Sequence, residues 1–299
     1  MATYRTVARV ARELLDSPHL APRTKVLYGQ ILGCFLAEAG NTLIDGITRE
    51  DVEAYLTGLN HLSVRTHHLH QTVIARMFHF AVERGYIDTS PAAFIKRRRS
   101  DATRGEHRSD EAVRYLTPAQ VRTLMRVSDT NPRLHALLWL LYESGARIAE
   151  VLTLNTGSID LNRCQFPVVG KGNKKRQCFF GERAAGALRE YLTHHREAPH
   201  TALFTERGKR FNDVRPLSYA TAWRDLREVT EGYRSLHGIR FHDLRHTFAT
   251  ERARILPLEV LRALMGHEKI QTTLIYQKIT SQVARESAQE AIQRLAESW

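Results

Sequence analysis

The sequence predicts a mainly α-helical protein of two domains, the second of which carries one small antiparallel β-sheet. Three observations lead to this prediction. Apolar residues recur at helical spacing through most of the chain, two short apolar runs flank a glycine-rich turn near residue 170, and a basic stretch with almost no apolar residue separates the two halves. The length of 299 residues is sufficient for two domains of ordinary size.

Residues 1–96 are expected to form a small helical domain. Apolar residues at positions three or four apart, such as Val7, Val10 and Leu14, mark the faces of helices that turn toward a core. Thr48 followed by Asp51 has the spacing of a helix N-cap with an acidic residue in the first turn. The same helical spacing continues from residue 73 to residue 82.

Residues 97–114 are expected to form a basic and polar linker. The stretch begins with Arg97, Arg98 and Arg99 and continues without the apolar residues that a packed segment needs. We expect these three arginines to lie against DNA phosphates. The alternative is a charged segment that is only solvated.

Residues 115–299 are expected to form the second domain. Thr117 and Pro118 have the residue types of an N-cap and a first helical position. A buried helix follows at 134–142, and a hairpin is expected around the turn at 170–173, with Pro167 marking an edge strand. Everything after Gly181 is expected to be helical, including an amphipathic helix at 281–297.

The charge balance favours a nucleic-acid partner. The net charge is +12, divided as +4 in residues 1–100 and +8 in the remainder, so both halves are basic. The cysteines at positions 34, 164 and 178 form no C-x-x-C pair, which argues against a disulfide framework or a cysteine zinc site. The chain shows neither a signal peptide nor an apolar run long enough to cross a bilayer, so we expect a soluble cytoplasmic protein.

The densest polar motif is the segment H-D-L-R-H at 242–246. Residues three or four apart share a helix face, so His242, Arg245 and His246 are expected to project together. Two histidines at this spacing could also bind zinc, as in H-E-x-x-H proteins. Against this, Asp243 replaces the glutamate base, and Arg245 would place a positive charge beside the metal.

Five separate segments occur in a fixed order. They are Arg147 in A-R-I-A-E, Lys171 in G-K-G, the H-D-L-R-H motif, the pair Gly266 and His267, and Tyr276 nine residues later. This set strongly resembles the tyrosine recombinases, the phage integrase and Xer-like family. The resemblance covers the whole second domain, and the first domain is similar to the helical, SAM-like core-binding domain of that family.

The resemblance implies a role for each residue of the set. Tyr276 matches the nucleophile that attacks a backbone phosphate, which leaves a 3′-phosphotyrosine and a free 5′-hydroxyl. Arg147 and Arg245 match the two arginines that clamp the non-bridging phosphate oxygens, a task suited to their planar forks. His242 matches a proton acceptor or hydrogen-bond donor near the nucleophile, and His267 matches a donor to the phosphate.

The resemblance also implies roles for Lys171 and Glu150. Lys171 matches the hairpin lysine that protonates the 5′-oxygen leaving group, although Lys174 and Lys175 lie close by and are also candidates for DNA contact. Glu150 matches an acidic position that braces the site. Cations gathered on one phosphate would do the electrostatic work of a divalent metal, so neither a metal nor another cofactor is implied.

The expected function is site-specific DNA recombination, in integration, excision or resolution. The implied partners are double-stranded DNA with inverted core sites and other protomers, in a homo-tetramer or a hetero-tetramer with a related recombinase. Two alternatives remain open on the same scaffold: a non-catalytic DNA-binding regulator and a nicking and closing enzyme like the type IB topoisomerases. Departures from the family pattern, at Ser90 and at Gln277 with Lys278, lie away from the chemistry.

Overall fold

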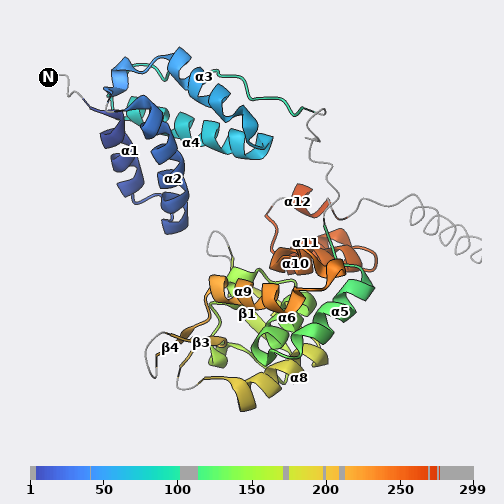
Figure 1. Ribbon diagram of the computed structural model, residues 1–299. Coiled ribbons are helices and arrows are strands. Elements are labelled where there is room, and N and C mark those ends of the chain that lie inside the picture. The colour runs from blue at the N-terminus through green and yellow to red at the C-terminus, as the bar shows by residue number, and fades with distance from the viewer. Residues whose placement is uncertain are drawn as a thin grey trace, which may run out of the picture. The chain divides into compact units, whose positions relative to one another are not determined.

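The chain consists of two compact units, Met1–Glu111 and Ala112–Trp299, which Figure 1 shows in a computed structural model. The structure describes residues 5–40, 42–101, 114–170, 175–197, 200–208, 213–268, 270–274 and 276. The division between the units falls inside the segment 97–114 that the sequence suggests as a linker. In these ranges no helix combines the length and apolar character needed to cross a membrane.

The first unit is a helical bundle in which short 3₁₀ turns separate the longer helices. Its elements are α1 (Val7–Asp16), α2 (Pro22–Ala39), η1 (Ile44–Gly46), α3 (Arg49–Gly58), η2 (Leu59–His61) and α4 (Val64–Glu83). The expected cap of α3 is present, because Thr48 Oγ1 accepts from the Asp51 amide and the Asp51 carboxylate accepts from the Thr48 amide. The aromatic rings of Phe35, Tyr55 and Phe78 meet edge to face in the core of this unit.

The beginning of the expected linker contacts the first unit through Arg98, so the alternative of a segment that is only solvated does not describe this residue. Arg98 is partly buried, and its guanidinium donates to the carbonyl oxygens of Asn60 and Leu62 at 3.4 and 3.1 Å. His68 in α4 hydrogen-bonds the Arg98 carbonyl at 2.8 Å. The sequence pattern did not predict these contacts, because hydrogen bonds of polar groups hold the segment and apolar burial does not.

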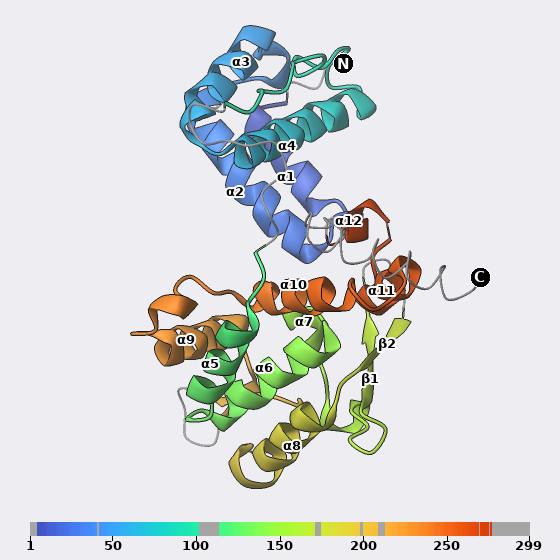
Figure 2. The ribbon, with the colours of Figure 1, turned by 90° about the vertical axis from the view of Figure 1, so that its right-hand side faces the viewer.

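The described part of the second unit is mainly helical and contains two small sheets, of which β1 and β2 are labelled in Figure 2 and β3 and β4 in Figure 1. Its first half comprises α5 (Pro118–Ser128), α6 (Pro132–Ser144), α7 (Ile148–Val151), η4 (Thr156–Ser158), β1 (Gln165–Val169), β2 (Lys175–Phe179) and α8 (Glu182–Glu190). Its second half comprises the π turn η6 (Tyr191–His195), β3 (Thr205–Arg207), β4 (Val214–Pro216), α9 (Tyr219–Thr230), η7 (Arg234–Leu236), α10 (Phe241–Arg252), α11 (Leu258–Met265) and α12 (Gln271–Leu274).

Local sequence signals account for the start of this unit. Thr117 caps α5 in a capping box with Gln120, and Pro118 occupies its first turn as expected. Helix α6 is apolar on most of its surface because it lies in the centre of the unit, where its leucines are buried. Gly145 ends this helix in the left-handed conformation, with φ of +63°.

The expected hairpin is present, but a second one was not expected. Strands β1 and β2 pair antiparallel with Phe166 opposite Cys178 and Pro167 opposite Gln177. Strands β3 and β4 form a further two-stranded sheet, with Glu206 opposite Arg215. The prediction that everything after Gly181 is helical is therefore wrong, because strands of three residues are too short to show an alternating pattern.

Helix α10 has a central place in the second unit. It packs against α6 on one side and against α11 on another, and α11 in turn contacts β2. A small apolar cluster of Phe248, Ala249, Leu261, Met265 and Tyr276 joins the end of α10 to α11. The residues from 277 onward, which include the amphipathic helix expected at 281–297, lie outside the described part of the chain.

Candidate active site

The first turns of α10 supply three of the site residues. The Asp243 carboxylate accepts from the Arg240 amide at the start of the helix and is fully buried. Because positions three and four apart share a helix face, this start directs His242, Arg245 and His246 to one side, as the sequence predicts. The rings of His242 and His246 pack edge to face with centroids 4.4 Å apart.

Arg245 is buried, with 2% of its surface exposed, and its guanidinium is fixed by three acceptors. It donates to the carbonyl oxygens of Gly145 and Met265, each at 2.5 Å, and to Nε2 of His267 at 3.1 Å. Burial, followed by the nearby charges of Arg147 and Arg176, lowers the pKa of Arg245 to about 10. Arg245 therefore remains a cation at neutral pH in a region that already repels positive charge.

The hydrogen bonds of His267 fix its tautomer. Arginine can only donate, so Nε2 of His267 must accept from Arg245, and the ring proton is on Nδ1. That Nδ1 donates to Oγ1 of the buried Thr273, 2.9 Å away. Burial and then the charge of Arg245 lower the pKa of His267 to about 4, which agrees with a neutral ring.

Arg147 precedes α7 and belongs to an ion-pair network centred on Glu150. Its guanidinium lies 3.0 Å from the Glu150 carboxylate, which also binds both terminal nitrogens of Arg176, in β2, at 2.9 and 2.8 Å. Burial raises the pKa of Glu150, but the hydrogen bonds from Arg176 and Arg147 outweigh this effect and lower the pKa to about 2. One ionised carboxylate thus holds two arginines from different elements, and Arg147 keeps 38% of its side chain exposed.

Tyr276 lies beside the H-D-L-R-H face with its ring in the small cluster between α10 and α11. Its hydroxyl is 2.8 Å from Nδ1 of His246, and its ring is nearly parallel to that of His267, with centroids 6.4 Å apart. Burial raises the pKa of Tyr276, while the charges of Arg245 and Arg147 oppose the rise. The hydroxyl is therefore a phenol at neutral pH.

The structure brings together Arg147, His242, Arg245, His267 and Tyr276, and it adds residues that the sequence reasoning had not assigned to the site. The histidine that meets the Tyr276 hydroxyl is His246, although the resemblance drew attention to His242. The shared helix face was visible in the sequence, but the contact with Tyr276 was not. Arg176 and Thr273 carried no sequence signal of their own.

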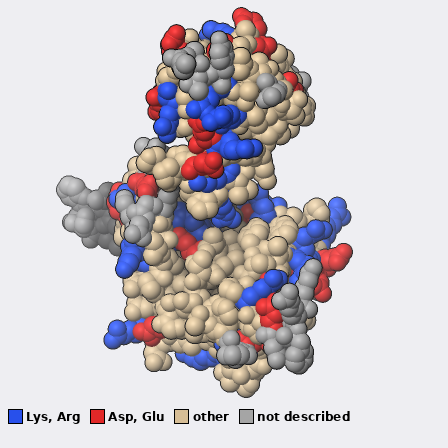
Figure 3. Space-filling view, turned by 90° about the vertical axis from the view of Figure 1, so that its left-hand side faces the viewer, with Lys and Arg blue, Asp and Glu red and all other residues tan. Residues whose placement is uncertain are grey.

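The remaining sequence candidates either lie outside the described residues or are exposed elsewhere on the surface. Lys171 and Lys174 lie outside the described residues, and Lys175 is exposed at the start of β2. Arg97 and Arg99 are exposed in the first unit. Figure 3 shows Lys and Arg side chains on the visible surface of each unit, with Asp and Glu among them.

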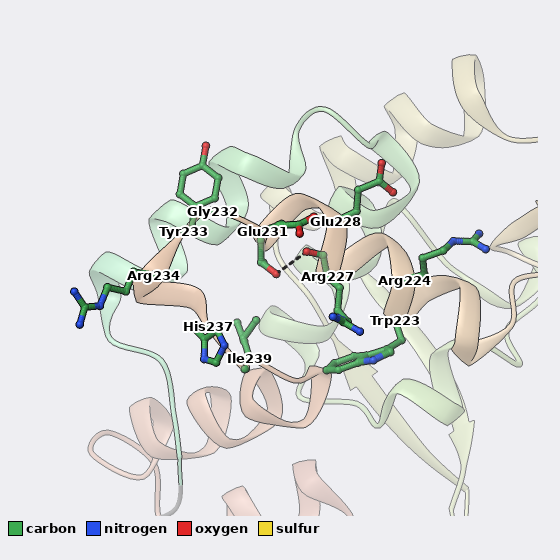
Figure 4. Close-up of a pocket in the computed structure, with 12 residues that line it drawn as sticks. Trp223, Arg224, Arg227, Glu228, Glu231, Gly232, Tyr233, Arg234, His237 and Ile239 are labelled. Carbon is green, nitrogen blue, oxygen red and sulfur yellow. Dashed lines mark hydrogen bonds between the residues drawn. The ribbon is translucent and has the colours of Figure 1, made fainter.

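A separate open cavity of about 1200 Å³ lies between the end of α9 and η7 (Figure 4). Trp223 and His237 lie on its wall, together with Arg227 and the acidic Glu228 and Glu231. None of the residues around Tyr276 lines this cavity. Its mixture of positive and negative groups does not select one class of ligand.

Comparison with known proteins decides the family. Residues 114–282 match the model of the phage integrase family, which is more than half of the chain. The chain is a member of this family of tyrosine recombinases. This tyrosine recombinase is therefore an enzyme of site-specific DNA recombination that breaks and rejoins DNA.

Relatives of this tyrosine recombinase include Xer proteins. It is 26% identical over 285 residues to tyrosine recombinase XerC of Shewanella amazonensis, covering 92% of this chain and 91% of that protein. It is 31% identical over 224 residues to tyrosine recombinase XerD of Corynebacterium glutamicum, covering 72% of this chain and 70% of that protein.

Solved structures share the fold of this tyrosine recombinase. The Tn1549 transposon integrase in complex with transposon right end DNA has a TM-score of 0.75 at 19% identity, with 98% of this chain and 100% of that chain covered. A lambda integrase dimer bound to a core site has a TM-score of 0.70 at 15% identity, with 93% and 78% covered. These matches confirm the predicted fold class, with the second small sheet as an addition.

Proposed function

We propose that this tyrosine recombinase cleaves DNA by attack of the Tyr276 hydroxyl on a backbone phosphate, forming a 3′-phosphotyrosine and releasing a 5′-hydroxyl. The observation that carries the proposal is the position of the Tyr276 hydroxyl beside a ring nitrogen, in a cluster with two arginines. The covalent bond conserves the energy of the phosphodiester, so that attack by a 5′-hydroxyl of another strand reverses the step.

In this proposal Arg147 and Arg245 bind the non-bridging oxygens of the scissile phosphate. The fixed guanidinium of Arg245 and the partly exposed one of Arg147 support this role, because pre-oriented donors stabilise charge that grows in the transition state. His242 donates a further hydrogen bond to the phosphate. Lys171 protonates the departing 5′-oxygen, and Glu150 braces the two arginines that it binds.

His267 is proposed to contact the phosphate only after a change of partner. Its Nε2 accepts from Arg245 in the absence of DNA and so cannot donate at the same time. When phosphate oxygens take over the donors of Arg245, Nε2 becomes free to carry a proton and donate. Thr273 would then exchange its role from acceptor to donor at Nδ1, which a hydroxyl can do.

The test of the nucleophile is the variant Tyr276→Phe, which removes only the hydroxyl. We expect it to bind site DNA as the parent protein does and to form no SDS-resistant protein–DNA adduct. The matched control is Tyr233→Phe, which alters an exposed tyrosine remote from the cluster and leaves adduct formation unchanged. An adduct that persists in Tyr276→Phe would place the nucleophile elsewhere.

The DNA contacts of the first unit are proposed to come from Arg97 and Arg99, because the guanidinium of Arg98 is directed to main-chain carbonyls. Lys174 and Lys175 would contact the backbone beside the hairpin. Each exposed cation that neutralises a phosphate should reduce the dependence of log Kd on log salt concentration by about one unit when it is removed. Titrations of Arg97→Gln, Arg99→Gln and Lys175→Gln over a salt series measure this.

The assembly proposed for catalysis is a tetramer on two inverted core sites, acting in the cytoplasm on integration, excision or resolution. A solved structure of lambda integrase supports it, since that protein is a tetramer bound to a Holliday junction in the crystal. The amphipathic pattern at 281–297 suggests a helix that docks on a neighbouring protomer, a head-to-tail contact that closes into a ring.

Removal of residues 282–299 tests this assembly. The truncated protein should fold and bind a single half-site, but lose cooperative binding to paired sites and strand exchange. Sedimentation with site DNA separates a tetramer from a monomer of the topoisomerase type. Recombination at the full rate by the truncated protein would contradict docking between protomers.

A further inference from the structure

The side chain that contacts the reacting atom of Tyr276 is His246, not the histidine that the sequence motif emphasises. Nδ1 of His246 and the Tyr276 hydroxyl oxygen are 2.8 Å apart, the distance of a well-formed hydrogen bond. The two ring centroids are 5.7 Å apart, with 47° between the ring planes. A general base must lie within such reach of the proton that it takes.

The direction of this hydrogen bond follows from the charges around it. Burial lowers the pKa of His246 to about 4, with further contributions from His242, Arg245 and Arg240. The ring is therefore neutral at pH 7 and has one nitrogen that donates and one that accepts. Burial raises the pKa of Tyr276, so the tyrosine is a phenol. A phenol is a better donor than acceptor, and its proton points to Nδ1.

His242 is less suited to take that proton. It is exposed on the first turn of α10, and its ring packs against the edge of His246. A phenol carries a single proton, and the acceptor nearest to it is already His246. His242 thus remains available to donate to a phosphate, as assigned above.

We propose that His246 is the general base that removes the phenolic proton of Tyr276 as the oxygen attacks phosphorus. This inference rests on the proposed function of Tyr276 as nucleophile. In the step, the phenolic O–H bond breaks and its proton passes to Nδ1, the new bond joins the tyrosine oxygen to phosphorus, and the bond to the 5′-oxygen breaks. The 5′-oxygen leaves with a proton from the general acid, and the reverse reaction returns the proton of His246 to the tyrosine.

DNA binding makes this base stronger. Arg245 and Arg240 disfavour a proton on His246 in the DNA-free protein. A phosphate bound by Arg147 and Arg245 brings negative charge close to His246. This charge offsets the nearby cations, so it favours the imidazolium that forms during attack. The nucleophile is thus kept protonated until its substrate is bound.

The variant His246→Asn separates the two roles that this residue could have. The asparagine side-chain oxygen can accept a hydrogen bond near the position of Nδ1, but it hardly takes up a proton. Single-turnover cleavage of a nicked duplex by His246→Asn should be slower by about 10²- to 10⁴-fold, with DNA binding and melting temperature retained. Should this variant be unstable, His246→Gln also removes the ring base, although its amide group corresponds in position to Nε2 and not to Nδ1. The control His194→Gln, at an exposed histidine, should cleave at the parent rate.

Two chemical changes then identify the step. Fluorinated tyrosine at position 276 has a more acidic phenol, so it should restore much of the rate in His246→Asn. A substrate with sulfur in place of the bridging 5′-oxygen needs no leaving-group acid, and it should not restore the rate.

The outcomes distinguish this inference from the function on which it rests. Cleavage by His246→Asn within about threefold of the parent rate, rescue by the sulfur substrate, or no rescue by fluorotyrosine would each overturn the role of His246 as base. Failure of the parent protein and of His194→Gln to form an adduct through Tyr276 would instead overturn the proposed nucleophile.

Discussion

Arg245 donates to the carbonyl oxygen of Gly145 at 2.5 Å, although the two residues are 100 positions apart in the chain. This bond fixes helix α10 to the turn that ends α6, only two residues before Arg147. The two arginines proposed to bind the phosphate are therefore positioned by one shared piece of backbone. A substitution at Gly145 or at Arg245 should therefore affect the positions of both arginines.

Replacement of Arg245 by lysine should impair cleavage although lysine also carries a positive charge. A lysine ammonium cannot reproduce a planar fork aimed at Gly145, Met265 and His267. The surroundings also lower the pKa of a cation here, and lysine starts from a lower value than arginine. We expect a loss of about 10²- to 10³-fold in the single-turnover cleavage rate, with near-normal DNA affinity. A variant that cleaves at the parent rate would refute the clamp.

Replacement of Gly145 by alanine should be strongly destabilising. Its φ of +63° is unfavourable for any residue with a Cβ, and a Cβ here would lie 2.4 Å from Cδ1 of Phe248. Phe248 cannot easily give way, because the guanidinium of Arg252 stacks over its ring at 3.9 Å. The backbone strain alone costs about 1–2 kcal/mol in the free energy of unfolding, and the contact adds to it.

The matched control for this change is Gly186→Ala in α8, where a Cβ meets nothing within 4 Å. That substitution should stabilise the protein by about 0.5–1 kcal/mol, because alanine favours a helix interior over glycine. Urea unfolding of both variants gives the comparison. Equal effects of the two alanines would contradict the role assigned to Gly145.

Replacement of Glu150 by glutamine should disrupt the site through Arg147, which Glu150 holds, although Glu150 is not itself proposed to bind the phosphate. Glu150 has 8% of its side chain exposed and neutralises both Arg147 and Arg176. Removal of one partner from a buried ion pair costs about 3–5 kcal/mol in the free energy of unfolding, since the remaining charges are unpaired. The control Glu182→Gln, at an exposed carboxylate, should change stability by no more than about 0.5 kcal/mol. If Glu150→Gln changes the free energy of unfolding only slightly, Arg176 finds another partner and the predicted role of Glu150 is wrong.

The sequence was most informative where a local pattern reports on structure. The cap at Thr117, the end of α6 at Gly145 and the hairpin of β1 with β2 all follow from residue types within a few positions of each other. The second hairpin escaped prediction because its strands are short and the buried residues of β3, Thr205 and Glu206, are polar. Glu206 accepts from the Ser218 amide and forms an ion pair with Arg215 instead of packing among apolar neighbours. A polar interior of this kind leaves no hydrophobic pattern to read.

The candidate site shows the same limit. Helical spacing predicted that His242, Arg245 and His246 share a face, and the structure agrees. Which histidine meets Tyr276 depends on how the chain returns after α12, and no residue near the H-D-L-R-H motif encodes that return. The pairing of Glu150 with Arg176 likewise arises only when the fold brings α7 beside the β1–β2 hairpin.

The last prediction concerns the response of stability to pH. His246 and His267 have pKa values of about 4 in the folded protein, below the ordinary value of 6.5. Between these values the unfolded chain binds more protons than the folded chain, so the free energy of unfolding falls as the pH decreases from 6.5 toward 4. After allowance for solvent screening, each histidine should account for about 1–2 kcal/mol of this loss.

Urea unfolding at several values between pH 7.5 and about pH 5 tests this, because above pH 5 the carboxylates, including Glu150, contribute little to the slope. Replacement of His267 by glutamine removes one titrating group. It should therefore reduce the slope of the free energy of unfolding against pH, whatever its effect on stability at pH 7.5. His194→Gln, at an exposed ring, should leave the slope of the parent protein unchanged. A slope that is the same in all three proteins would mean that His267 is not held neutral by its burial and by Arg245. The tautomer derived from the Arg245 and Thr273 hydrogen bonds would then be wrong as well.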